Sequence, residues 1–380
     1  MRGSGRTVIT RPEQNPARRA ELSKTVGISA IATYEPPWVL GNDWFDGTLS
    51  RKFVQHTGIL SRRISQEDEV TMGIRAVQNL QSQTGCDLRN CVAVVLASSS
   101  LIHGYVARRY LGKEHARREN FGAVAQEFVE RLGIPSVRVF SLNWGCSGYA
   151  KAMEIAARYA ARRPRLRRDQ FILVVTVNRT SKITDYGCKA TAPIFGDFAQ
   201  ATLLGGDESH RHPMQLALVY AAAERQPADG AFFNYHLREN VAVPAPAGGR
   251  AFEPRRLVFS LDMMGLGDAA PRAMANAAAK ALQATNIHPE EVDFVVPHQA
   301  GTGVIRLTAM KLEELGIRGE VINGLTQHVG NISSSSVPYA LQQNWDRLHG
   351  TILCPTAAVG RPGHASLTQG CLILTKGGRR

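Results

Sequence analysis

The fold follows from ten residues, Ser141-Leu142-Asn143-Trp144-Gly145-Cys146-Ser147-Gly148-Tyr149-Ala150. The β-branched and aromatic residues at 137–140 predict a strand before them, and an Ala-rich run predicts a helix over 149–161. Cys146 therefore lies at a strand-to-helix junction. The free N–H groups and the dipole of such a helix lower a thiol pKa and favour the nucleophilic thiolate. A buried structural cysteine is the commoner role of a free cysteine, so this segment alone leaves both interpretations open.

The length and composition indicate a globular protein. The chain has 380 residues, of which 44% are hydrophobic, so it can bury a large core. This length predicts two to three domains or one large duplicated unit. The sequence contains no apolar run of the ~20 residues that a membrane span needs. Residues 1–24 are basic and polar and lack the apolar segment of a secretory signal, so we expect a flexible basic leader.

Cysteine usage and charge narrow the choice of partners. The six cysteines show neither a Cys-x-x-Cys pair nor zinc-ligand spacing with histidine, which predicts free thiols in the cytoplasm and no metal. The net charge is +13, but the sequence holds no basic helix interleaved with aromatic residues. We therefore expect neither nucleic acid nor a membrane as a partner. The arginines either form a solvated surface or dock an acidic carrier protein.

Strands and helices alternate along the chain, which predicts an α/β fold with mostly parallel sheets. Continuous apolar runs at 91–98 and 171–177 are typical of strands buried on both faces. We expect residues 227–253 to be rich in loops, whereas 101–120 form a polar, basic insertion without an assignable element. Apolar periodicity predicts helices over 121–132, 268–284, 303–315 and 338–348.

Two further polar side chains lie where an α/β fold places its chemistry. His298 follows a predicted strand over 292–296, and ligands of open α/β sheets bind at the carboxyl ends of strands. Asn331 follows a glycine and precedes a serine-rich turn into a helix. A lone histidine is usually a core or surface residue, and an asparagine beside glycine and serine is usually a turn former. Only their combination with Cys146 points to a site.

The combination resembles the Cys-His-Asn triad of β-ketoacyl synthase III-type enzymes in the thiolase superfamily. The similarity spans about residues 25–376. The residues that carry it are Gly-Cys-Ser-Gly at 145–148, Val-Pro-His-Gln-Ala at 296–300 and Gly-Asn-Ile-Ser-Ser-Ser-Ser-Val-Pro at 330–338. Three further segments support it: Thr57-Gly58-Ile59, Arg62-Arg63-Ile64 and Phe195-Gly196-Asp197.

The resemblance implies a five-layered αβαβα thiolase fold, active as a homodimer. Its two related halves would be residues 25–206, with the nucleophile, and 207–380, with the histidine and asparagine. Cys146 would take an acyl group from a thioester, while His298 and Asn331 stabilise the enolate of the second substrate. No cofactor is implied besides the phosphopantetheine arm of the carrier-bound substrate. The resemblance also implies backbone oxyanion donors at Cys146 and Ala365 and an acyl pocket shaped by Phe121, Trp144 and Phe195.

The sequence departs from the family pattern in three respects. The C-terminal glycine-rich loop becomes 360–370, with fewer glycines and an added His364, so the pocket shape differs. Lys52 and His56 stand where housekeeping members carry a Trp and an Arg that sandwich the adenine of coenzyme A. Acyl groups on a carrier protein are therefore the expected donors. The chain is also longer than the housekeeping enzyme, which points to specialised metabolism.

The expected activity is Claisen-type carbon–carbon bond formation between a Cys-bound acyl group and a malonyl- or β-ketoacyl-carrier thioester. One alternative is a ketosynthase-cyclase that joins two β-ketoacyl units into a dialkylresorcinol or cyclohexanedione. A second is a housekeeping fatty-acid initiation synthase. A third is an acyltransferase, or a non-catalytic partner subunit, on the same fold. The complete triad argues against the non-catalytic subunit, and the sequence leaves the acyl chain lengths open.

Overall fold

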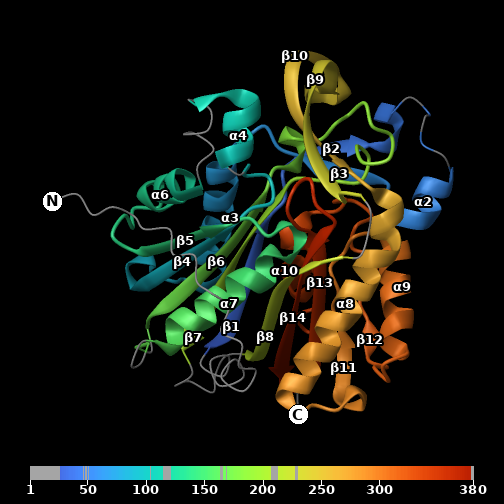
Figure 1. The fold of residues 1–380 in the computed structure, drawn as a ribbon. Helices are drawn as coiled ribbons and strands as arrows, with labels where there is room; N and C mark the ends of the chain where they lie inside the picture. Colours follow the sequence, from blue (N-terminus) through green and yellow to red (C-terminus); the bar gives the residue numbers. More distant parts are fainter. Residues whose placement is uncertain are drawn as a thin grey trace.

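The protein is represented by a computed structural model (Figure 1). The predicted leader over 1–24 lies outside the described residues. Within the part that is described, no helix is both long and apolar enough to cross a membrane. Apart from a few single positions, the description covers residues 26–45, 51–102, 104–113, 121–162, 169–206, 213–226 and 230–377.

Ten described strands form one sheet. The first five are β1 (Val26–Tyr34), β4 (Cys91–Ala97), β5 (Arg138–Leu142), β6 (Phe171–Asn178) and β7 (Phe198–Gly206). The other five are β8 (Met214–Arg225), β11 (Val292–Val295), β12 (Glu320–Val321), β13 (Gly350–Val359) and β14 (Ser366–Lys376). A short pair, β2 (Trp38–Gly41) and β3 (Ser61–Ile64), lies apart from this sheet.

The sheet consists of two halves with the same strand order. The first runs β5-β4-β6-β7-β1 and the second β12-β11-β13-β14-β8, and β1 pairs with β8 where the halves meet. In each half the first three strands are parallel and the last two are antiparallel to their neighbours. The expectation of a mostly parallel sheet is wrong, because strands such as β13 and β14 follow each other as a hairpin and must pair antiparallel. The exact boundary between the halves at 206/207 stays a prediction.

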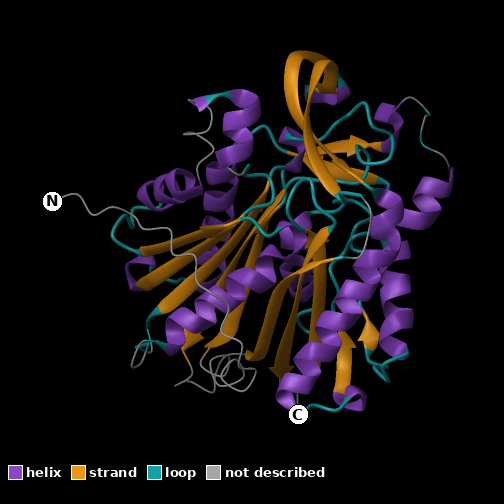
Figure 2. Cartoon of the chain, in the orientation of Figure 1, coloured by secondary structure: helices purple, strands orange, loops and turns teal. Residues whose placement is uncertain are grey.

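The described helices form three layers around the two half-sheets (Figures 1 and 2). The outer layer of the first half contains α3 (Glu69–Thr84) and α6 (Phe121–Arg131), and that of the second contains α8 (Met263–Thr285) and α9 (Thr302–Glu313). Between the halves lie α7 (Gly148–Ala161) and α10 (Ser336–Gln343). This succession gives the αβαβα layers that the resemblance implies. Two short helices, α2 (Arg51–Thr57) and α4 (Gly104–Leu111), lie at the periphery.

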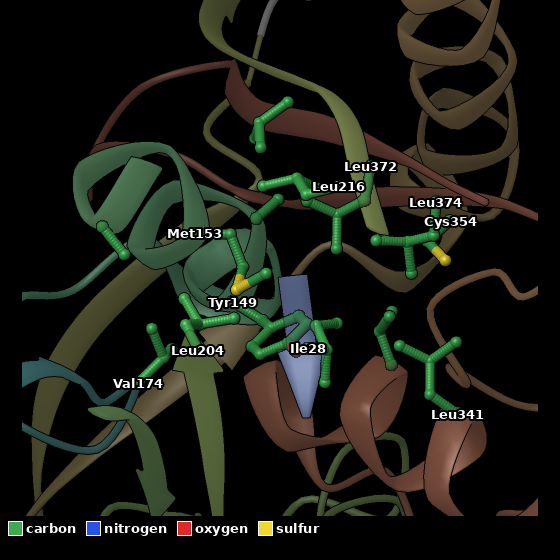
Figure 3. Packing of buried hydrophobic residues seen from close by; sticks show 14 of the residues in the cluster. Ile28, Tyr149, Met153, Val174, Leu204, Leu216, Leu341, Cys354, Leu372 and Leu374 are labelled. Atoms are coloured by element: carbon green, nitrogen blue, oxygen red, sulfur yellow. The ribbon is translucent and has the colours of Figure 1, made fainter. Parts of the chain in front are cut away.

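The central layer holds the largest buried cluster (Figure 3). Helix α7 is rich in alanine, so its backbone can lie close to the strands of both halves. Tyr149 and Met153 project from it into the cluster and are fully buried. The Tyr149 hydroxyl keeps a partner, since it lies 3.2 Å from Thr202 Oγ1. The strand-to-helix junction at Cys146 is thus anchored by a helix that contributes many buried residues to this cluster.

The structure corrects one interpretation of the sequence. The expectation of loops over 227–253 is wrong, because β9 (Phe233–Pro244) and β10 (Arg250–Leu261) form a long antiparallel hairpin that rises from the molecule (Figure 1). Its base buries Tyr235, Leu257 and Phe259, which pack on α4. The proline- and glycine-rich tip hid this alternation of buried residues. The unassigned insertion at 101–120 contains α4, while 114–120 lie outside the described residues.

Truncation of Met153 tests the central layer. Met153→Ala should lower the free energy of unfolding by about 2–5 kcal/mol, because it opens a cavity in a core that cannot collapse freely. Urea denaturation followed by circular dichroism measures the change. Met264→Ala is the matched control, since Met264 is 91% exposed. Equal effects of the two substitutions would contradict the proposed role of the central cluster.

Candidate active site

One cavity of about 1010 Å³ opens where strands of both half-sheets end. Cys146 follows β5, His298 follows β11, and Asn331 precedes α10; all three line this cavity. Trp144 and Phe195, two of the residues predicted for an acyl pocket, also line it. The structure thus brings Cys146 together with His298 and Asn331, which follow it in the sequence by more than a hundred residues.

The backbone before Cys146 is fixed by Asn143. Its Nδ2 donates to the Leu101 carbonyl at 2.8 Å, and its Oδ1 accepts from the Gly145 N–H at 3.0 Å. Gly145 has φ +50°, and a Cβ there would lie 2.9 Å from the Cβ of Ala358 on β13. Glycine is therefore required by conformation and by space at this position. Cys146 occupies the short turn between β5 and α7, so the expected strand-to-helix junction is confirmed.

The ionisation of Cys146 differs from the expectation. Burial raises the pKa of its thiol to about 11, although a hydrogen bond from Ser333 and one from the backbone oppose this. The Ser333 hydroxyl donates to Sγ at 3.5 Å, and Ser333 itself has φ +53°, which is unusual for a residue with a side chain. The prediction of a resting thiolate is wrong, because desolvation outweighs the start of α7. The cysteine has to lose its proton during the reaction.

His298 is held as a neutral imidazole. It is buried, and burial lowers its pKa to about 4. Its Nδ1 lies 2.6 Å from Ser336 Oγ, and the Gln299 N–H donates to the same oxygen at 3.3 Å. Because Ser336 accepts from Gln299, its own proton can be donated to Nδ1. The ring proton then resides on Nε2, and the histidine can donate a hydrogen bond from that atom.

Asn331 is held by the first half of the chain. Its N–H donates to the Ile194 carbonyl at 2.8 Å, and its carbonyl accepts from the Gly196 N–H at 3.1 Å. Its side-chain Oδ1 accepts from the Ser333 N–H at 2.9 Å. The oxygen is thereby occupied, so Nδ2 is the group that Asn331 can offer to a ligand. We refer to this backbone connection between 194–196 and Asn331 as the Asn331 clamp.

The segments that supported the resemblance stabilise this clamp. Arg62 is buried and donates to the Pro193 carbonyl at 2.7 Å, next to the clamp. Asp197 accepts from the Ser65 N–H at 2.7 Å and from the Ser181 hydroxyl at 2.6 Å. Burial lowers the pKa of Arg62 to about 10 and raises that of Asp197 to about 6. Their hydrogen bonds show that both side chains hold loops in place and do not face the cavity as reactants.

Sequence reasoning missed three residues that shape the site: Ser333, Ser336 and Asn178. Asn178 ends β6 and is fully buried. Its Nδ2 donates to the Ile332 carbonyl at 3.1 Å, and its Oδ1 accepts from Ser334 Oγ at 3.0 Å. A polar residue at the carboxyl end of a buried strand was the available signal. The sequence does not indicate the roles of Ser333 and Ser336, because a serine-rich turn does not show which hydroxyl contacts which partner.

The remaining predicted residues have different positions. Ala365 is buried and its carbonyl accepts from the Gln226 N–H, while its neighbours His364 and Ser366 line the cavity. Phe121 begins α6 and is absent from the cavity lining of the described chain. Their roles stay predictions.

His56 lines the cavity mouth and Lys52 a smaller pocket beside it. Among described residues, no cluster of three or more His, Cys, Asp or Glu could hold a metal.

Comparison with known proteins shows which family this fold and site resemble. Residues 140–220 match the family 3-oxoacyl-[acyl-carrier-protein (ACP)] synthase III, and residues 282–361 match its C-terminal family. These two segments contain Cys146, His298 and Asn331. The chain is a ketosynthase of the β-ketoacyl synthase III type. It thus belongs to the acyltransferase class, and its architecture is the thiolase fold.

Relatives extend this similarity over most of the chain. A β-ketoacyl-[acyl-carrier-protein] synthase III of Staphylococcus saprophyticus is 29% identical over 323 residues, which cover 84% of this chain and 89% of the relative. The solved synthase III of Thermus thermophilus is 26% identical, with a TM-score of 0.69 and coverage of 93% and 100%. The tetronic acid condensing enzyme AbyA1 shares the fold, with a TM-score of 0.70, 16% identity and coverage of 92% and 100%.

Removal of the Ser336 hydroxyl tests the tautomer of His298. In Ser336→Ala, Nδ1 loses its donor, so Nε2 should no longer carry the proton in all molecules, and condensation should slow by about tenfold or more. Nitrogen-15 NMR of labelled histidine reports the tautomer directly, beside the turnover rate. Ser82→Ala, on the exposed face of α3, is the control. An unchanged tautomer in Ser336→Ala would refute this positioning role.

The ionisation of Cys146 is tested by alkylation. Because the thiolate reacts and the pKa is about 11, the rate of modification by iodoacetamide should rise about tenfold per pH unit from pH ~7 to ~10. Mass spectrometry of the Cys146 peptide measures this rate, and Cys146→Ala gives the background from the other cysteines. A plateau already near neutral pH would indicate a resting thiolate.

Proposed function

We propose that this ketosynthase forms a carbon–carbon bond between an acyl group on Cys146 and a malonyl- or β-ketoacyl thioester, both delivered by an acyl carrier protein, in specialised polyketide or fatty-acid metabolism. One observation carries the proposal: a thiol, a neutral imidazole and a carboxamide share the wall of one large apolar cavity. The cavity excludes much of the water that would otherwise hydrolyse an acyl intermediate. No cofactor takes part; the reacting groups are those of the chain and of the substrate thioesters.

In the first half-reaction Cys146 Sγ attacks the carbonyl carbon of the acyl thioester. The carbon–sulfur bond to the pantetheine arm breaks, and the Cys146 proton ends on the departing thiol. The raised pKa of Cys146 makes its thiolate rare but strongly nucleophilic. The backbone N–H groups of Cys146 and Ala365 would stabilise the oxyanion. Ala365 is held in place because its carbonyl accepts from the Gln226 N–H.

In the second half-reaction a malonyl thioester loses carbon dioxide. The electron pair of the broken carbon–carbon bond forms an enolate, whose oxygen accepts hydrogen bonds from His298 Nε2 and Asn331 Nδ2. The enolate carbon attacks the acyl carbonyl, and Cys146 leaves and regains a proton from solvent. The low pKa of His298 suits this role, because a neutral imidazole with its proton on Nε2 can donate a hydrogen bond to the enolate oxygen. Donors fixed at developing charge typically contribute a few kcal/mol each.

An acidic carrier protein fits the mouth of the cavity. Arg225, Arg306 and Arg361 line it and are exposed, which supports electrostatic attraction to such a partner. Lys52 and His56 stand in place of the Trp and Arg that would hold adenine, so we favour carrier-bound over coenzyme A donors. All six cysteines lie in described residues and are free thiols, which supports a reducing, cytoplasmic setting.

We propose further that the enzyme is a homodimer. Strand β5 lies at the edge of the ten-stranded sheet, with Val139 and Phe140 half-buried. An edge strand offers unpaired backbone groups to a second copy, and such a contact would cover these side chains. Phe121 of one subunit would then shape the acyl pocket of the other. Cys146 follows directly on β5, so the dimer contact would also support the nucleophile.

The triad assignment is tested by separating the two half-reactions. Cys146→Ala should abolish acyl transfer from a labelled acyl-carrier thioester, as seen by intact-protein mass spectrometry. His298→Ala and Asn331→Ala should still form the acyl adduct but lose condensation with malonyl-carrier by about a hundredfold or more, because each removes a donor to the enolate. Cys86→Ala, remote from the cavity, is the control for acylation. Loss of acylation in both donor variants would overturn the assignment of roles.

A further inference from the structure

Ser333 has an unusual backbone conformation in a buried position. Of the described residues other than glycine, only Asn240, Asn286 and Ser333 have a positive φ. Asparagine adopts this region more readily than most residues, and both asparagines are exposed. Serine has no such advantage, and Ser333 is only 2% exposed. The contacts of Ser333 therefore have to explain why a serine occupies this position.

The turn around Ser333 is held by its backbone and by its neighbours. The Ser333 N–H donates to Asn331 Oδ1 at 2.9 Å. Asn178 Nδ2 donates to the Ile332 carbonyl at 3.1 Å, and Asn178 Oδ1 accepts from Ser334 Oγ at 3.0 Å. Such contacts can keep a residue in an unfavourable conformation, and residues of this kind gather at active sites. A glycine at position 333 would keep all of these hydrogen bonds.

What serine adds to this turn is a hydroxyl group, and the hydroxyl contacts the nucleophile. Ser333 Oγ donates to Cys146 Sγ at 3.5 Å. Among the described residues, the Ser333 hydroxyl has no other hydrogen-bond partner. Glycine would adopt the same φ at a lower cost. The contact with sulfur is therefore the feature that a glycine could not supply.

We propose that Ser333 is a further catalytic residue, whose hydroxyl stabilises the Cys146 sulfur whenever that sulfur carries negative charge. This inference rests on the proposed function. In acylation, the charge is present on the thiolate before Sγ attacks the substrate carbonyl. In condensation, the carbon–sulfur bond of the tetrahedral intermediate breaks, its electron pair stays on Sγ, and the product carbonyl forms. Ser333 keeps its proton throughout, and the thiolate later takes up a proton from solvent.

The hydroxyl favours the anion over the other states of the sulfur. Hydrogen bonds to a charged acceptor are about twice as strong as neutral ones, so the bond to a thiolate is stronger than the bond to a thioester sulfur. An interaction that strengthens as charge develops lowers the barrier. The donor also makes the thiolate less nucleophilic, but with a Brønsted coefficient of about 0.4–0.5 this loss is smaller than the gain in thiolate population. The net gain in rate is about threefold for each unit by which the thiol pKa falls.

The first experiment measures the ionisation of Cys146 without a substrate. Ser333→Gly removes the hydroxyl and relieves the backbone, whereas Ser333→Ala removes the hydroxyl alone. Because both variants lose the donor, iodoacetamide should modify Cys146 at least about threefold more slowly at pH ~8. Asn286→Gly, at the exposed end of α8, is the matched control and should react like the wild type. An unchanged rate in either Ser333 variant overturns the inference.

Thermal unfolding separates this role from a structural one. Ser333→Gly should unfold at the wild-type temperature or above, because glycine adopts a positive φ without strain. Circular dichroism measures the Tm of the wild type, of Ser333→Gly and of the Asn286→Gly control. A fall of more than about 5 °C in Ser333→Gly would show that the hydroxyl stabilises the fold, and would overturn the inference.

The last experiment distinguishes an effect at Sγ from an effect at Asn331. Ser333→Gly keeps the N–H that fixes Asn331, so the unacylated variant should release carbon dioxide from malonyl-carrier at the wild-type rate. Condensation by the acylated variant should fall about tenfold or more, because Cys146 leaves without its donor. Equal losses of both activities would assign the effect to Asn331 and overturn the role at sulfur. A wild type that forms no acyl adduct would refute the proposed function, whereas the alkylation rates would still decide whether Ser333 stabilises the thiolate.

Discussion

The site depends on the Asn331 clamp, two backbone hydrogen bonds between Asn331 and residues 194–196. In the proposed reaction one half of the chain supplies the nucleophile and the other supplies the hydrogen-bond donors, so a connection has to set the distance between them. Backbone bonds suit this purpose because they vary less than side-chain contacts. Gly330 and Gly196 make the close approach possible, since a Cβ at Gly330 would lie 2.9 Å from the Ile194 carbonyl oxygen. Arg62 and Asp197 then hold the first half of the clamp.

Burial determines the protonation states of Cys146 and His298. It raises the pKa of Cys146 and lowers that of His298, so both groups are neutral at rest. An ion pair between them would require two charges in a cavity with few compensating groups. The neutral state keeps the imidazole proton available as a donor, which Ser336 directs to Nε2. The same desolvation that hinders ionisation of the thiol would strengthen each hydrogen bond to the proposed enolate.

The sequence predicted the layers, the junction at Cys146 and the shared site, because each depends on a local pattern or a family motif. It did not predict the β9–β10 hairpin, whose alternation is interrupted by a proline- and glycine-rich tip. The prediction of an ionised Cys146 was wrong for a different reason. The helix terminus is visible in the sequence, whereas the degree of desolvation depends on tertiary packing. The roles of Ser333 and Ser336 required coordinates as well, since identical neighbours in one turn face different partners.

The proposed reacting groups and much of the apolar lining of the cavity belong to different parts of the fold. The triad is fixed by the central layer, where α7 packs against both half-sheets and Asn178 bonds the turn after Asn331. Much of the apolar lining of the cavity comes from the periphery: from the β9–β10 hairpin on one side, and from α8 and α9 on the other. Substitutions at Leu261 or Ala270 change the cavity volume without touching the clamp or the Ser336–His298 contact. Substitutions at two distant sites usually have additive effects on the free energy of unfolding. We therefore expect the arrangement of Cys146, His298 and Asn331 to tolerate changes in the apolar lining.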